Sequence, residues 1–179
     1  MGMHVPEIKG MLRSHIIEIP NVIRQVSGVK IFGKVLKSFI FTTDIAVIKN
    51  NNADAIIAVY PFTPQPLITQ TLVSAADVPV FCGVGGGTTM GKRVVNLALD
   101  AEFKGAMGVV VNSPTSNEVI RHMRDTIDIP IIVTVVSEYE DIEARINAGA
   151  TILNVSGARK TAYIVKKIRE QFPQFPIIA

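Results

Sequence analysis

The chain has 179 residues, of which 48% are hydrophobic and 18% are charged, with a net charge of +3 at pH 7. This length allows one sizeable core, and the composition excludes a disordered protein. No apolar run is long enough to span a bilayer, and the N-terminus lacks the charged-then-apolar layout of a signal peptide. The small positive charge does not by itself indicate nucleic-acid binding. We therefore expect a cytoplasmic protein with neither a membrane nor a nucleic-acid partner.

The first 37 residues are expected to form an extension ahead of the main fold. Within it, Val29–Leu36 is predicted to be a short hairpin that turns at Gly33 and plugs the bottom of a barrel. Ser38–Thr43 is apolar and follows as the first strand, and the segment 44–50 is predicted to be a short helix.

Six further apolar runs are predicted to be strands buried on both faces, because they are rich in Val and Ile and show little alternation. Stretches of helical period separate them, which indicates parallel pairing through helical crossovers. The runs begin near Ala55, Val78, Ala106, Ile129, Thr151 and Phe175. Residues 38–179 thus predict six β/α units and the start of a seventh strand, an incomplete parallel (β/α)₈ TIM barrel.

The competing architecture is an open, doubly wound sheet. That fold usually shows a glycine fingerprint after its first strand, and none follows Thr43. The chain also carries an internal repeat, since Val78-Pro79 and Ile129-Pro130 are 51 residues apart. Both observations favour the barrel, and a complete barrel of typical size predicts about 60 further residues in the natural protein.

Active sites of such barrels lie at the carboxyl ends of the strands, where this sequence places polar residues after apolar strand bodies. Asp44 and Glu138 are the candidate catalytic acid–base residues. Asp44 is alternatively a charge at the start of a helix, and Glu138 part of the first turn of the next helix. The candidates for orienting a substrate are Asn112, Thr134 and Asn154.

The segment from Gly85 through Gly86 and Gly87 to Thr88 and Thr89 is the most distinctive of these strand ends. Free backbone N–H groups there, with Lys92 in the following helix, are expected to bind an anionic group. The alternative is a tight turn that needs positive φ, with a threonine as N-cap. A nucleotide P-loop is disfavoured because Arg93 stands where Ser or Thr would bind Mg²⁺.

Other chemistries find little support in the sequence. The three histidines are scattered, so no metal site is expected, and no lysine lies within the second to seventh strands to form a Schiff base. The single cysteine, Cys82, excludes an internal disulfide and is interpreted as a core residue. No cofactor is predicted.

The segments KSFIFTTDIA, DAIIAVYPFTPQP, VPVFCGVGGGTT, GAMGVVVNSPT, IPIIVTVVSEYEDIEARINAGA and ILNVSGA together resemble a group of uncharacterised Firmicute barrels labelled hydrolase. This group belongs to the ribulose-phosphate-binding barrel superfamily. The resemblance implies an enzyme, a hydrolase or lyase, that acts on a small phosphorylated metabolite. In the superfamily the phosphate is usually held after strands seven and eight, loops that this sequence does not contain.

Two alternatives to an enzyme remain from the sequence. One is a non-catalytic ligand-sensing barrel, as in the antiterminator regulators of glycerol uptake, which the chain resembles only in architecture. The other is a structural subunit. For the chain itself we expect a small-molecule, anionic substrate as the partner, and self-association into a homo-oligomer through exposed strand edges.

Overall fold

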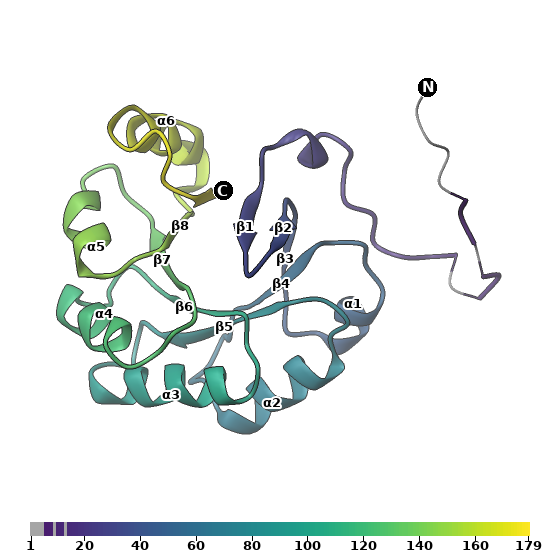
Figure 1. Cartoon of the computed structure of the whole chain (residues 1–179), viewed down its shortest axis with the longest axis horizontal. Coiled ribbons are helices and arrows are strands. Elements are labelled where there is room, and N and C mark those ends of the chain that lie inside the picture. The colour runs from purple at the N-terminus through teal and green to yellow at the C-terminus, as the bar shows by residue number, and fades with distance from the viewer. Residues whose placement is uncertain (1–5, 9, 13) are drawn as a thin grey trace.

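The computed structural model describes residues 6–8, 10–12 and 14–179 of the chain. In this part of the chain seven parallel strands form one curled sheet, and helices cover its convex side (Figure 1). The expected incomplete barrel is confirmed. The strands are β3 (Phe39–Phe41), β4 (Ala55–Ala58), β5 (Val80–Gly85), β6 (Gly108–Val111), β7 (Ile131–Val135), β8 (Ile152–Val155) and β9 (Ile177–Ile178).

The order of the strands decides between the barrel and the doubly wound sheet. Each strand pairs with the next one in sequence, from β3 through to β9. A doubly wound sheet would reverse this order at a switch point, which the described sheet does not do. The winding is therefore that of a barrel.

Three of the helices between the strands begin at a side-chain cap, and one of them ends at a glycine. Asp44, Ser116 and Asp141 each accept backbone N–H groups at a helix start, and Gly149, with φ +128°, ends α5. The helices are α1 (Ile45–Lys49), α2 (Pro66–Ala75), α3 (Lys92–Phe103), α4 (Asn117–Arg124), α5 (Ile142–Ala148) and α6 (Thr161–Gln171), with short 3₁₀ turns η1 (Ile23–Gln25) and η2 (Ala158–Lys160).

Two apolar clusters lie on the two sides of the sheet. The larger cluster packs the outward residues of the strands against the helices, and it includes the buried Cys82. The smaller cluster fills the barrel interior, where alternate strand residues such as Ile57, Phe81 and Ile132 meet. Because side chains alternate along a strand, nearly every strand residue is buried on one side or the other, which explains the unbroken Val/Ile runs.

The N-terminal hairpin contributes to the interior cluster. β1 (Val29–Ile31) and β2 (Lys34–Leu36) pair antiparallel, and the two turn residues, Phe32 and Gly33, both have positive φ. Ile31 and Leu36 pack with the interior strand residues, and Figure 1 shows the hairpin on the concave side of the sheet. The predicted hairpin and its turn are confirmed, whereas the division of the chain at residue 37 stays a prediction. Residues 1–5, 9 and 13 of the extension lie outside the described residues.

Within the described ranges, no helix has both the length and the apolar character needed to cross a membrane.

Candidate binding site at the barrel mouth

A pocket of about 500 Å³ opens at the carboxyl ends of β4, β5 and β6. This volume is within the usual range for small-molecule sites, and the position is where barrel enzymes carry theirs. We call it the mouth pocket. Its lining consists of Val59, Tyr60, Pro61, Phe62, Thr63, Pro64, Gly83, Gly85, Gly86, Gly87, Thr88, Thr89, Val110 and Asn112. The predicted residues Gly85 to Thr88 and Asn112 thus lie together.

The glycine-rich segment forms a tight turn rather than an open cradle. Gly86 and Thr89 exchange two backbone hydrogen bonds, of 3.1 and 3.2 Å, so their N–H groups are engaged within the turn. Gly86 and Gly87 have φ of +118° and +60°. The predicted need for positive φ is confirmed, but the threonine N-cap is wrong, because Gly91 occupies the N-cap of α3. We call residues 86–89 the glycine turn.

Gly86 lies against Asn112 across the pocket wall. An added Cβ at Gly86 would overlap the Asn112 Cβ and lie 3.0 Å from its Cγ and Nδ2. The close approach follows from a register shift in the pairing of β5 with β6 between Gly83 and Gly85, which turns Gly85 toward Val94 of α3. Only a glycine fits at position 86 on both steric and conformational grounds.

Asn112, Thr134 and Asn154 lie in one row across three neighbouring strands, which we call the polar row. Thr134 pairs in register with Asn154, and Asn112 follows Val111, whose partner is Val133. Each row residue comes two positions after an interior residue, so it faces the barrel interior one layer nearer the mouth. Thr134 and Asn154 are buried, and the Asn154 Nδ2 donates to the Thr134 Oγ1 at 3.2 Å.

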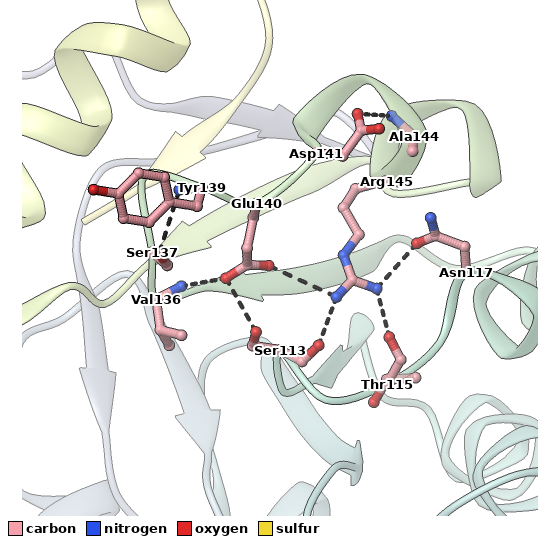
Figure 2. Close-up of polar contacts among 10 residues, drawn as sticks. All are labelled: Ser113, Thr115, Asn117, Val136, Ser137, Tyr139, Glu140, Asp141, Ala144 and Arg145. Atoms are coloured by element: carbon pink, nitrogen blue, oxygen red, sulfur yellow. Dashed lines mark hydrogen bonds and ion pairs between the residues drawn. The ribbon is translucent and has the colours of Figure 1, made fainter.

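A partly buried ion pair joins the loops that follow β6 and β7 (Figure 2). The Glu140 Oε1 accepts hydrogen bonds from the Ser113 hydroxyl at 3.0 Å and the Val136 N–H at 2.8 Å. Arg145 donates to the carbonyl oxygens of Ser113 and Thr115 and to the Asn117 Oδ1, and its Nη2 lies 3.6 Å from the Glu140 Oε2. The pair ties the residue after Asn112 to the end of β7, so it holds the polar row together.

Glu138 pairs with Lys160 at the β7–β8 side of the mouth. The Lys160 Nζ donates to the Glu138 Oε1 at 3.1 Å, and this hydrogen bond is the main cause that lowers the pKa of Glu138. Its Oε2 is buried without a hydrogen-bond partner in the described residues. Glu138 precedes the Asp141 N-cap of α5, so the alternative of a first-turn helical residue is wrong.

Two other predicted residues lie elsewhere. Asp44 caps α1, with its Oδ1 accepting from the N–H groups of Ala46 at 2.7 Å and Val47 at 3.3 Å, as its alternative reading expects. Lys92 lines a separate hollow between α3 and α4, beside His122 and Asp125. A catalytic role for Asp44 and an anion-binding role for Lys92 stay predictions.

Tyr60 of the lining and the buried Cys82 both pack in the cluster on the helix side of the sheet. The Tyr60 hydroxyl and the Thr69 Oγ1 are 2.9 Å apart, and burial is the main cause that raises the pKa of Tyr60. Burial also raises the pKa of Cys82 to about 12. Both groups are therefore neutral at physiological pH, and the interpretation of Cys82 as a core residue is confirmed.

The sequence reasoning missed the Glu140–Arg145 pair and the pairing of Lys160 with Glu138. Arg145 lies within a regular helical pattern and Lys160 beside Arg159, so both resemble ordinary solvated side chains in the sequence. Their partners lie in loops outside the helix or turn that carries them, and the spacing along the sequence does not indicate the pairing. The polar strand ends were the one signal that pointed to this region.

The sequence matches no protein-family model and no curated protein. In structure the chain is similar to KGPDC from Streptococcus mutans, with a TM-score of 0.58 and 14% identity over 80% of this chain and 78% of that chain. It is similar to dihydrodipicolinate synthase from Aquifex aeolicus, with a TM-score of 0.57 and 18% identity over 74% and 54%. A third similar structure is phosphonopyruvate hydrolase in complex with oxalate and Mg²⁺, with a TM-score of 0.54 and 13% identity over 70% and 59%.

These likenesses establish the TIM-barrel fold. At such low identity they say nothing of the reaction. The chain spans 51 to 54% of the length of the dihydrodipicolinate synthase structures that it matches, or about half.

Proposed function

We propose that the chain provides the substrate site of a TIM-barrel enzyme, a hydrolase or lyase, that acts on a small phosphorylated metabolite. The resemblance in sequence to the ribulose-phosphate-binding barrels supports the substrate class. The likeness in fold to KGPDC and to a phosphonopyruvate hydrolase agrees with an enzyme on this scaffold.

The polar row is the observation that carries the proposal. Asn112, Thr134 and Asn154 bring two amides and a hydroxyl to the interior face of the barrel, directly above an apolar layer. Thr134 and Asn154 are buried, whereas Asn112 is exposed at the mouth pocket. Buried polar side chains lower stability unless they gain partners, and a purely structural barrel would fill this layer with apolar side chains. A bound substrate would supply hydrogen-bond partners beyond the single contact between Asn154 and Thr134.

We assign the proton-transfer role to Glu138 in preference to Asp44. Lys160 keeps Glu138 ionised, so at neutral pH this carboxylate would act as a base rather than an acid. The Asp44 oxygen that caps α1 already accepts two backbone hydrogen bonds, which suits a structural role.

For the phosphate, the proposal favours the β7–β8 side of the mouth, where Arg159 and Lys160 lie in η2. The glycine turn with Lys92 is the other position that we predicted. It is less suited because the Gly86 and Thr89 N–H groups bond within the turn and Lys92 faces the hollow between α3 and α4.

The test is a thermal-shift screen of the chain with inorganic phosphate, pyrophosphate, and triose and pentose phosphates. A compound at about 100 times its Kd stabilises the protein by about 2.7 kcal/mol. For a domain of this size that raises Tm by about 5–11 °C. We expect such a shift with at least one sugar phosphate, and its reduction by at least half in Asn154→Leu.

Asn147→Leu is the matched control, because Asn147 is an exposed asparagine on α5 away from the row. It should keep the full ligand-induced shift. If no sugar phosphate raises Tm, or if Asn154→Leu responds like Asn147→Leu, the proposed function is wrong.

A binding-only barrel is the second candidate, and one observation favours it. The lining of the mouth pocket contains no carboxylate, histidine or lysine among the described residues. A barrel that binds its ligand in this pocket without turning it over would need none. A ligand that saturates the site, with no chemical change on prolonged incubation, is the result that would favour this candidate.

A further inference from the structure

We infer that the mouth pocket selects an uncharged, flat group of the ligand, such as an aromatic or heteroaromatic amide. This inference rests on the proposed function, since it names what the neutral end of the same substrate must be. It is carried by the character of the pocket walls.

One wall is apolar and comes from the end of β4 and the loop after it. Val59, Pro61, Phe62 and Pro64 line this wall, and Val110 of β6 is buried beneath the pocket. The Phe62 side chain is 84% exposed, although it borders a pocket. A flat ring laid in the pocket would cover this aromatic face, and the two prolines restrict how far the loop can move.

Another part of the lining is polar but uncharged. It consists of the glycine turn and the Asn112 side chain, whose Nδ2 lies close to Gly86. Peptide and amide groups can both donate and accept hydrogen bonds, so they match the edge of an amide or of a ring with a nitrogen. The pocket thus pairs an apolar face with a neutral hydrogen-bonding edge.

An anion fits this pocket poorly for two reasons. No arginine, lysine or histidine of the described residues lines it, so a bound carboxylate or phosphate would lose hydration without gaining a counter-charge. The Gly86 and Thr89 N–H groups, which could otherwise bind an anion, bond to each other's carbonyl oxygens within the turn. The titratable side chain of the lining, Tyr60, contacts Thr69 with its hydroxyl and stays neutral at physiological pH.

The experiment compares benzamide, benzoate and inorganic phosphate by amide chemical shifts of the ¹⁵N-labelled full chain. Benzamide and benzoate have almost the same shape and differ in charge. We expect benzamide to shift the Gly86, Gly87 and Thr88 amides and the Asn112 side-chain amide, saturating at millimolar concentration as suits a ligand of about nine non-hydrogen atoms. Benzoate should bind at least tenfold more weakly, and phosphate should leave these resonances unchanged.

Phe62→Ala and Phe103→Ala form a matched pair of variants. Both phenylalanines are highly exposed, at 84% and 79%, but Phe103 lies at the end of α3 and is absent from the lining. Phe62→Ala should weaken benzamide binding at least threefold, whereas Phe103→Ala should leave it unchanged.

Benzoate or phosphate binding here as tightly as benzamide would overturn the inference, and so would the absence of benzamide shifts. These failures are separable from a failure of the proposed function. If sugar phosphates still raise Tm through Asn154 while benzamide fails to bind, the inference alone is wrong. If neither class binds, both are wrong.

Discussion

Replacing Gly86 by alanine tests how closely the glycine turn packs against the polar row. The φ of Gly86, +118°, lies where residues other than glycine are strained by about 1–3 kcal/mol. The new Cβ would also overlap the Asn112 Cβ, and forced overpacking typically costs about 1–3 kcal/mol. The two contributions together span about 2–6 kcal/mol, so we expect Gly86→Ala to lower the free energy of unfolding by about 4 kcal/mol, the middle of that range.

Gly87→Ala is the matched control in the same turn. Gly87 also has positive φ, at +60°, but its added Cβ would meet no atom within 4 Å. Gly87→Ala should lower the free energy of unfolding by about 1 kcal/mol, which is the cost of the backbone conformation alone. Urea unfolding of the two variants measures the difference of about 3 kcal/mol, which corresponds to about 6–12 °C in Tm for a domain of this size.

A double-mutant cycle isolates the contact with Asn112. In an Asn112→Gly background the overlapping Cβ is gone, so the additional cost of Gly86→Ala to the free energy of unfolding should fall by at least about 1 kcal/mol. Equal destabilisation by Gly86→Ala and Gly87→Ala, or a cycle with no coupling, would refute the close packing of the turn on the row.

Three further predictions concern the charged and titratable groups. Arg145→Met should lower the free energy of unfolding by about 3 kcal/mol in urea melts, because it leaves the Glu140 carboxylate, 14% exposed, without its cation, and an undiminished stability would contradict the role of the pair. Because the pKa of Glu138 is lowered in the folded state, the carboxylate stabilises the fold above the ordinary glutamate pKa of 4.5, and this contribution is lost as the pH falls through the folded pKa. The Tm difference between the wild type and Glu138→Gln should accordingly be full at neutral pH and shrink as the pH falls below 4.5, and a pH-independent difference would contradict the pairing with Lys160. Cys82, fully buried and with its pKa raised to about 12, should not react with a thiol reagent at pH 8 until urea unfolds the chain, and rapid reaction of the folded protein would place it at the surface instead.

The barrel was predictable because each strand carries its own signal. A run such as Ile131–Val135 is apolar at every position except Thr134, since one side of the sheet faces the helices and the other faces the interior. Parallel strands need helical crossovers, so the period of the segments between them completes the assignment. The hairpin at Gly33 was predictable for a similar local reason, a glycine between two short β-rich segments.

The site was only partly predictable, because its contacts join distant parts of the chain. Strand-end position was enough to select Asn112, Thr134 and Asn154 for the same end of the barrel. It could not show that the Gly86 N–H bonds to Thr89, or that Lys92 points between α3 and α4. Self-association through exposed strand edges also stays a prediction.

Contacts between different loops are the hardest to predict from sequence patterns. Glu140 and Arg145 are only five residues apart, yet their partners in the loop after β6 lie about 30 residues earlier in the chain, as the contact of Arg145 with Thr115 shows. Nothing in the composition of either loop indicates such a contact. The register of the folded sheet creates it.

The most direct test of the proposed site is a chemical-shift map of the compound that gives the largest thermal shift. The account predicts that the amides of Asn112, Thr134 and Asn154 shift together, with the same saturation curve, because the polar row faces the bound molecule. Shifts confined to the hollow at Lys92 and His122, or to the space between β3 and β9, would contradict it and move the site away from the barrel mouth.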